Sequence, residues 1–195
     1  MVLYYLIKRK NRITITIFVV LSAVALNGLF SYINNLLSLP IFLDSIFTIL
    51  TAALFGLWPA VTVGLLSNFF IETINGFPGI YYPFAIINVL TALITAIFVS
   101  KKIFETPAHA FWLIITLTLI NSLTGAIVVT IVFGGFTNLS MDNIVRGVMM
   151  TGNSIFSSVF IVRLVVNLVD KGIAVILAFS LYKAIQRKGN ENLYS

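Results

Sequence analysis

The chain has 195 residues, of which 59% are hydrophobic and only 9% are charged. Soluble domains carry about 25% charged residues, so this composition excludes a soluble globular protein and a disordered one. Long unbroken apolar runs also exclude an outer-membrane barrel, whose strands would alternate in polarity over ~10-residue segments. Together with a mean hydropathy of +1.07, these features predict an all-α membrane protein.

Six apolar stretches are candidates for membrane-spanning helices, which need about 20 residues each. In chain order they are Ile13–Leu37, Ile41–Phe55, Trp58–Ile74, Tyr81–Val99, Phe111–Phe133 and Ser158–Ala184. The second is short and follows Pro40. Residues 8–25 also have the pattern of a signal peptide, but the apolar run continues well past them, which favours an uncleaved first helix. We therefore expect a single six-helix transmembrane domain over residues 1–189.

The basic residues predict how these helices are oriented. Nine of the twelve lie in three clusters, and they are Lys8, Arg9, Lys10, Arg12, Lys101, Lys102, Lys183, Arg187 and Lys188. Six spans with both termini in the cytoplasm place all three clusters on the cytoplasmic side, as the positive-inside rule requires. Five spans would place the last cluster outside. The net charge of +6 is thus explained by the lipid bilayer, without nucleic acid as a partner.

Several kinds of catalytic chemistry are absent from the sequence. The chain has no cysteine and one histidine, His109, so cysteine nucleophiles, zinc–thiolate sites and iron–sulfur clusters are excluded, and no metal site is expected. It contains no P-loop, no H-E-x-x-H and no G-x-S-x-G motif. We therefore expect no catalytic residue, no enzymatic activity and no cofactor, which leaves transport, sensing or scaffolding.

The chain ends in Glu191-Asn192-Leu193-Tyr194-Ser195, which matches the start of a commonly engineered protease site. Residues 190–195 are therefore expected to be a remnant of such a site or a disordered tail. They carry no functional prediction.

Pairs of small residues four positions apart let membrane helices approach each other closely. The sequence has Ala52/Gly56, Ala60/Gly64, Ala92/Ala96, Ser122/Ala126 and Ala174/Ala178. We expect these pairs to lie between helices of the same chain.

Polar side chains at membrane depth are the candidates for function. An Asp, Lys or Arg at mid-bilayer costs roughly 2.5–3.5 kcal/mol, so such residues usually face a cavity or a partner. In the predicted orientation most of them gather in the outer half, which predicts a small-molecule pocket that opens outward. The candidate substrate-binding residues are Asn34, Asp44, Asn68, Glu72, Tyr81, Tyr82, Asn88, Asn121, Arg163 and Asn167. The alternative is structural: amides that join helices, and charged groups that pair internally.

The segment from Leu39 to Gly56, LPIFLDSIFTILTAALFG, resembles the second-helix region of the substrate-binding (S) components of energy-coupling factor transporters. That region has the pattern P-x-F-L-D-T-I-x-T followed by A-A-L-x-G. Residues 58–68, 82–88 and 167–172 are also similar to this family. The resemblance implies a subunit of a bacterial plasma membrane that binds a vitamin or related micronutrient in an outward-facing pocket. It also implies partners: a membrane coupling subunit and two cytoplasmic ATPase subunits, which power uptake.

Docking and substrate identity are less well defined by the resemblance. Family members often carry an A-x-x-x-A pair on the first helix for docking, whereas this chain has Ala23 followed by Asn27, so the docking candidates are Ser22, Ala23 and Ala25. No residue points to one vitamin, although Tyr81 and Tyr82 are suited to stacking on a flat ring. Two other functions stay open: a membrane sensor module and a stand-alone secondary transporter.

Overall fold

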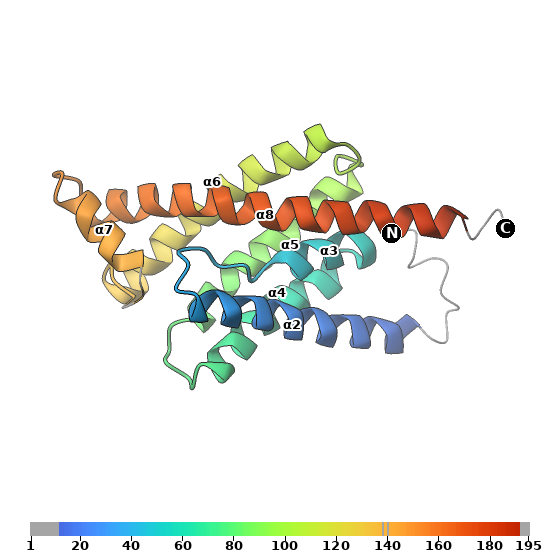
Figure 1. The fold of residues 1–195 in the computed structure, drawn as a ribbon, viewed down its shortest axis with the longest axis horizontal. Helices are drawn as coiled ribbons and strands as arrows, with labels where there is room; N and C mark the ends of the chain where they lie inside the picture. Colours follow the sequence, from blue (N-terminus) through green and yellow to red (C-terminus); the bar gives the residue numbers. More distant parts are fainter. Residues whose placement is uncertain (1–11, 138, 140, 192–195) are drawn as a thin grey trace.

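The computed structural model describes residues 12–137, 139 and 141–191, and within these residues every regular element is a helix. Figure 1 shows the long helices packed beside one another, with one short helix, α7, at one end. The elements are α2 (Arg12–Leu36), α3 (Ile46–Phe55), α4 (Leu57–Ile74), the 3₁₀ helix η2 (Tyr82–Phe84), α5 (Ala85–Ser100), α6 (Pro107–Phe133), α7 (Met141–Met149) and α8 (Ile155–Glu191).

Five of these helical regions are long and apolar enough to cross a membrane. They are Ile13–Leu36, Leu57–Ile74, Tyr82–Ser100, Pro107–Phe133 and Ile155–Lys188. This confirms a multi-pass, all-α membrane protein. The basic residues Lys8, Arg9 and Lys10 and the tail from residue 192 lie outside the described residues.

The second apolar stretch, Ile41–Phe55, is not the continuous helix that the sequence predicts. Only Ile46–Phe55 is helical, and its 10 residues rise about 15 Å, which is half of a hydrocarbon core of about 30 Å. Residues 37–45, here called the connecting segment, are not helical. Pro40 has no backbone N–H to donate, and Leu43 has a positive φ of 53°, which a helix does not accommodate.

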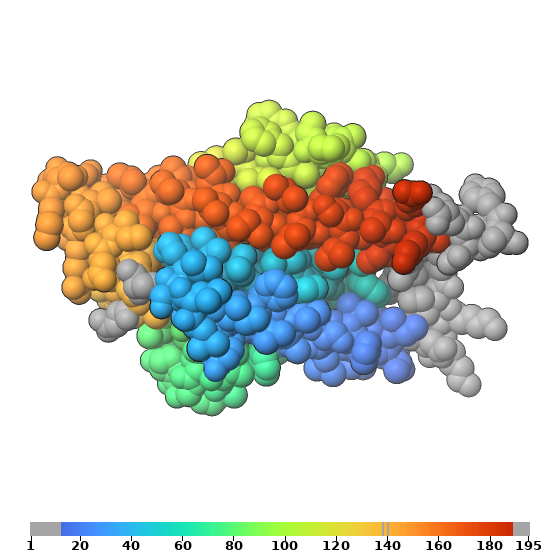
Figure 2. All heavy atoms as spheres, viewed as in Figure 1, coloured from blue at the N-terminus to red at the C-terminus, as the bar shows by residue number. Residues whose placement is uncertain are grey.

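Side chains from two helices bond the backbone of the connecting segment. Asp170 on α8 accepts hydrogen bonds from the backbone N–H groups of Phe42 (3.0 Å) and Leu43 (2.7 Å). Asn34 on α2 donates to the carbonyl oxygen of Ile41 (2.6 Å). Figure 2 shows this part of the chain packed between α2 and α8. Non-helical backbone at membrane depth is stable only where protein groups or a cavity supply its partners, as here.

The short helix α3 lies at the centre of the molecule. Seven of its ten residues are buried, and it contacts α2, α4, α5 and α8. Asn27 on α2 accepts a hydrogen bond from the backbone N–H of Phe47 in the first turn of α3 (3.0 Å) and donates to Thr48 and Ser67 (3.0 Å each). One buried amide therefore joins three helices and satisfies a donor that the helix start leaves free.

Small residues let the central helices approach closely, as the sequence predicts. Ala52, Ala60 and Ala92 form a buried cluster between α3, α4 and α5. At Gly64, an added Cβ atom would lie 2.7 Å from the backbone oxygen of Asn88. Any side chain at this position would therefore push α4 and α5 apart.

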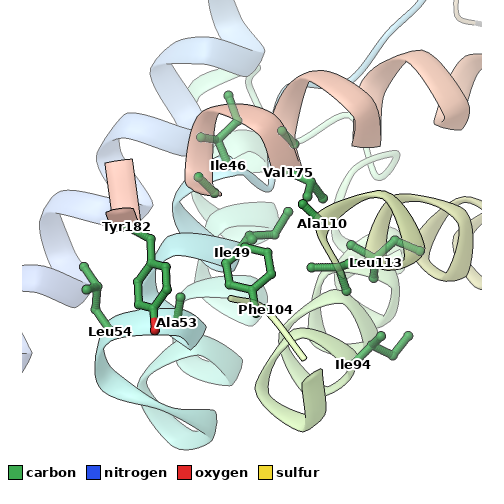
Figure 3. Close-up of a cluster of buried hydrophobic side chains, with 13 residues drawn as sticks. Ile46, Ile49, Ala53, Leu54, Ile94, Phe104, Ala110, Leu113, Val175 and Tyr182 are labelled. Carbon is green, nitrogen blue, oxygen red and sulfur yellow. The ribbon is translucent and has the colours of Figure 1, made fainter. Parts of the chain in front are cut away.

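The loop between α5 and α6 is anchored by an aromatic residue. Phe104 is 1% exposed and its ring centroid lies 5.2 Å from that of Phe179 and 5.6 Å from that of Tyr182, both on α8. Figure 3 shows Phe104 and Tyr182 among buried side chains of α3, α6 and α8. This cluster fixes the end of the molecule at which α8 terminates.

Five basic residues of the described chain gather at one end, whereas Arg146 on α7 lies toward the other. Figure 1 shows that α2 begins and α8 ends at the same end of the molecule, where the loop between α5 and α6 also lies. We call this the basic end, because these segments carry Lys101, Lys102, Lys183, Arg187 and Lys188. The start of the connecting segment, the loop between α4 and η2, and α7 lie toward the opposite end.

Candidate functional site

A cavity lies in the half of the molecule away from the basic end. Its walls come from the C-terminal part of α2, the connecting segment, α4, the η2 region, α5, α8 and the residues Thr137, Leu139 and Met141. The centre of a water molecule can occupy about 110 Å³ of it. Six of the ten predicted substrate-binding residues line this cavity: Asn34, Asp44, Asn68, Tyr81, Arg163 and Asn167. The structure thus brings together side chains that are up to 133 positions apart in the sequence, from Asn34 to Asn167.

Glu72 does not line the cavity but holds a loop in place. Its buried carboxylate, on a side chain that is 2% exposed, accepts hydrogen bonds from the backbone N–H groups of Gly79, Tyr81 (2.6 Å) and Tyr82 (3.1 Å). These bonds fix the loop between α4 and η2. The carboxylate therefore determines where Tyr81 stands in the cavity wall.

Three other predicted residues also lie outside the cavity wall. Tyr82 is half-exposed and its ring stacks on Phe69 at a centroid distance of 6.3 Å. Asn121 is buried and donates to Thr91 on α5 (2.9 Å). Asn88 lies behind the wall. The structural alternative thus describes the contacts of Tyr82 and Asn121 in this structure.

Asn88 connects two residues that do line the cavity. Its amide nitrogen donates to the carboxylate of Asp44 (3.1 Å) and to the amide oxygen of Asn68 (2.6 Å). Asn68 in turn donates to the carbonyl oxygen of Tyr81 (3.0 Å). A buried network of this kind keeps its members in fixed orientations, because a broken bond would leave a polar group unsatisfied. Asp44 is thereby held at the cavity wall.

The phenol of Tyr81 stays neutral over the physiological pH range. Burial raises the pKa of Tyr81 above its ordinary value, and the nearby carboxylate of Glu72 acts in the same direction, against a hydrogen bond from Asn35 (3.2 Å). A neutral phenol both donates and accepts hydrogen bonds. Tyr81 is therefore suited to contact an uncharged polar ligand.

A buried ion pair completes the wall on α8. The ammonium of Lys171 lies 2.8 Å from Asp170 and donates to the hydroxyl of Ser45 (2.8 Å). Lys171 also lines the cavity, although it was not among the ten predicted residues. Internal pairing of charged groups was the structural alternative, although helix-face spacing, which places sequence neighbours on different faces, does not predict this particular pair.

Arg163 stands in the wall between two aromatic rings. It is 5% exposed, and the carbon of its guanidinium lies 4.7 Å from the ring centroid of Phe84 and 5.5 Å from that of Phe42. Further along α8, Asn167 donates to Ser122 on α6 (3.1 Å), and Ser122 donates to the carbonyl oxygen of Arg163 (3.0 Å). These bonds across to α6 fix the turn of α8 from which Arg163 extends.

Other cavity-lining residues were not singled out by the sequence. They include Ser31, Phe42, Phe84 and Thr137. The phenylalanines are among 17 in the chain, so nothing in the pattern distinguishes them. Among the described residues, no group of three or more His, Asp or Glu side chains is placed to hold a metal ion.

The three predicted docking residues on α2 have different environments. Ala23 is 5% exposed and packs in a cluster with Val20, Val24 and Val63. Ser22 is half-buried and Ala25 is exposed. Ala23 thus faces the interior, and Ala25 presents the small surface on the outer face of α2.

The chain matches the family described as ECF-type riboflavin transporter, S component, over residues 13–187. The chain belongs to this family. The matched range begins with the first of the five candidate membrane-spanning helices and ends one residue before the last of them does, and it confirms the resemblance found in the sequence. An S component captures a small-molecule vitamin in the membrane and works with ECF partner subunits. No curated protein and no solved structure matches the chain.

Proposed function

We propose that this S component captures riboflavin in the cavity and delivers it for ATP-driven uptake across a bacterial plasma membrane. The observation that carries the proposal is the family match over residues 13–187. The energy comes from partner chains: a membrane coupling subunit and two cytoplasmic ATPase subunits. The cavity supplies the binding site.

The chemistry of the cavity wall supports a flavin as the ligand. Riboflavin joins a flat, three-ring isoalloxazine system to a flexible chain of hydroxyl groups. The wall offers aromatic rings from Phe42, Phe84 and Tyr81, and a carboxyl and a guanidinium group from Asp44 and Arg163. Small-molecule sites typically combine apolar and aromatic walls with a few convergent polar groups that fix orientation. Aromatic faces suit the rings, and polar side chains suit the hydroxyls and the ring carbonyls.

The distribution of basic residues supports an outward-facing cavity. The basic end carries five lysine and arginine residues, and the cavity lies away from it. Cytoplasmic loops are rich in lysine and arginine, which assigns the basic end to the cytoplasm. We infer six crossings, of which the second consists of the connecting segment followed by α3. Both chain termini are then cytoplasmic.

The absence of cysteine makes this orientation directly testable. Thr151 follows α7 and Lys101 follows α5, and both are exposed. Thr151→Cys should react with a membrane-impermeant maleimide in intact cells, whereas Lys101→Cys should react only after the membrane is permeabilised. The opposite labelling pattern would contradict an outward-facing cavity.

Docking on the coupling subunit is proposed to use the outer face of α2. Ser22 and Ala25 present small side chains there, and Ala23 is not available because it packs inward. A small surface lets a partner helix approach closely in a membrane. Ala25→Trp should therefore weaken co-purification with the coupling subunit, while riboflavin binding by the isolated S component stays unchanged.

Uptake of radiolabelled riboflavin tests the proposed function. Cells lacking other riboflavin uptake should accumulate the vitamin only when this chain is produced together with a coupling subunit and active ATPases. Uptake by the chain alone would indicate a secondary transporter, and binding of a separate signalling chain without uptake would indicate a sensor. Either result would contradict the proposal.

A further inference from the structure

The guanidinium of Arg163 has unfilled hydrogen-bonding capacity at the cavity wall. It makes no hydrogen bond and no ion pair with any of the described residues; its contacts are the rings of Phe42 and Phe84. A guanidinium carries five N–H donors in a fixed fork. Leaving such donors unpaired in a buried position is costly. A ligand group that accepts hydrogen bonds would remove that cost.

The local backbone gives this side chain a fixed place. At Gly125 on α6, an added Cβ atom would collide with a terminal nitrogen of Arg163 and lie 3.0 Å and 3.1 Å from its Cζ and Cδ atoms. The side chain therefore lies directly over the α6 backbone, with aromatic rings beside it. A donor group held in this way loses little conformational freedom when a ligand binds.

The charge of Arg163 is balanced at a distance. The carboxylates of Asp142 and Asp44 act on it electrostatically, yet neither lies within ion-pair distance. Asp142 accepts a hydrogen bond from Thr137 (3.2 Å), and Asp44 accepts one from Asn88 (3.1 Å). With Asp170 paired to Lys171, the two carboxylates that act on Arg163 leave no excess positive charge at the cavity. This arrangement presents donors without requiring an anionic ligand.

We propose that Arg163 donates hydrogen bonds to the carbonyl edge of the flavin pyrimidine ring, an assignment that rests on the proposed function. Each of the two carbonyl oxygens on that edge accepts hydrogen bonds and so suits a guanidinium donor, whereas the ring N–H between them needs an acceptor from another group. A neutral flavin adds no charge to the cavity, whereas a phosphorylated flavin would add negative charge to a wall that already holds Asp44. The cavity as a whole should therefore favour the free vitamin.

A cation at this edge has an electronic consequence. Charge near the flavin ring nitrogens tunes its reduction, because the pyrimidine ring gains negative charge when the flavin is reduced. The ratio of the affinity for reduced riboflavin to that for oxidised riboflavin should therefore be higher at this site than at a site without the cation. Removal of the charge should lower the midpoint potential of the bound vitamin.

The test uses the full chain in detergent, with riboflavin as the probe. Arg163→Met should weaken riboflavin binding at least tenfold and reduce the preference for reduced riboflavin about tenfold, which is a shift of about 30 mV for a two-electron couple. Arg163→Lys should bind more weakly than the unmodified chain but keep its midpoint potential. Arg146→Met is the control: Arg146 also lies over a phenylalanine ring (Phe136, 5.0 Å), but it is exposed and does not line the cavity.

The outcomes separate this proposal from the proposed function. If the unmodified chain binds riboflavin and Arg163→Met binds it equally well, or binds it with an unchanged midpoint potential, Arg163 does not contact the carbonyl edge. If Arg163→Met does not bind riboflavin, Arg163→Lys provides the test. A midpoint potential of bound riboflavin that is lower in Arg163→Lys than in the unmodified chain would overturn the proposal. Tighter binding of riboflavin 5′-phosphate than of riboflavin by the unmodified chain would assign Arg163 to an anionic group instead. If the unmodified chain binds no riboflavin, the proposed function itself fails.

Discussion

Asp170 offers the sharpest prediction about how the cavity wall is held. Its carboxylate bonds two backbone N–H groups of the connecting segment, on Phe42 and Leu43, and pairs with Lys171. Asp170→Asn removes the charge but keeps an oxygen that accepts from the two N–H groups. Asp170→Ala removes both functions. Comparison of the two variants therefore isolates the backbone hydrogen bonds from the ion pair.

The magnitudes follow from the burial of both partners. Asp170 and Lys171 are 0% and 1% exposed, and removal of one partner of a buried pair costs about 3–5 kcal/mol. An unsatisfied buried N–H costs about 1–3 kcal/mol, so Asp170→Ala should be less stable than Asp170→Asn by at least about 2 kcal/mol. Replacing both charged residues by apolar ones should recover part of the loss, because no uncompensated charge then remains.

The assay is the free energy of unfolding in a fixed detergent, combined with riboflavin affinity. The control is the exposed pair between Lys183 and Glu105 (3.2 Å), whose side chains are 38% and 45% exposed; Lys183→Met should cost at most about 1 kcal/mol. If Asp170→Ala proves no less stable than Asp170→Asn, the carboxylate does not hold the connecting segment. The reasoning is also refuted if Asp170→Ala lowers the free energy of unfolding by no more than Lys183→Met does.

Three further predictions concern the remaining polar and packing contacts. Glu72→Ala should lower the melting temperature and weaken riboflavin binding, because the loop that positions Tyr81 loses three hydrogen bonds; a melting curve unchanged from wild type would refute the anchoring role. Gly64→Leu should abolish the monodisperse folded protein on size exclusion, since its Cβ atom would meet the α5 backbone at 2.7 Å, whereas Gly147→Leu has open space and should be tolerated. Asp44→Asn should reduce the free energy of riboflavin binding by more than it reduces the free energy of unfolding. Equal reductions of the two would indicate a purely structural carboxylate.

The long helices were predictable because length and hydropathy alone define them. The segment before α3 was not, because its conformation depends on partners far along the chain. Asp170 lies 128 residues from Phe42, and no local pattern connects the two. Pro40 was visible in the sequence, but a proline at that position is also compatible with a helix that begins after it.

The types of residue at the candidate site could be predicted from the sequence, but the contacts of each side chain could be predicted only in part. Polar residues at membrane depth identified the cavity side chains Asp44 and Arg163. The same criterion also selected Asn121, because a polar group that joins two helices and one that faces a ligand look alike in sequence. Glu72 has its partners seven to ten residues further on, on loop backbone, and the conformation of a loop is not encoded in helix periodicity. Lys171 is also a charge at membrane depth, but the criterion does not distinguish its ion pair with Asp170 from its place in the cavity wall.

Equilibrium binding of riboflavin to the purified chain is the most direct test of the central claim. Titration followed by quenching of riboflavin fluorescence should show saturable binding of one molecule per chain, and Arg146→Met should bind equally well. Thiamine and biotin, which lack the isoalloxazine ring, should not compete. A folded, monodisperse protein that leaves riboflavin fluorescence unchanged and binds none by equilibrium dialysis would contradict the assignment of the cavity.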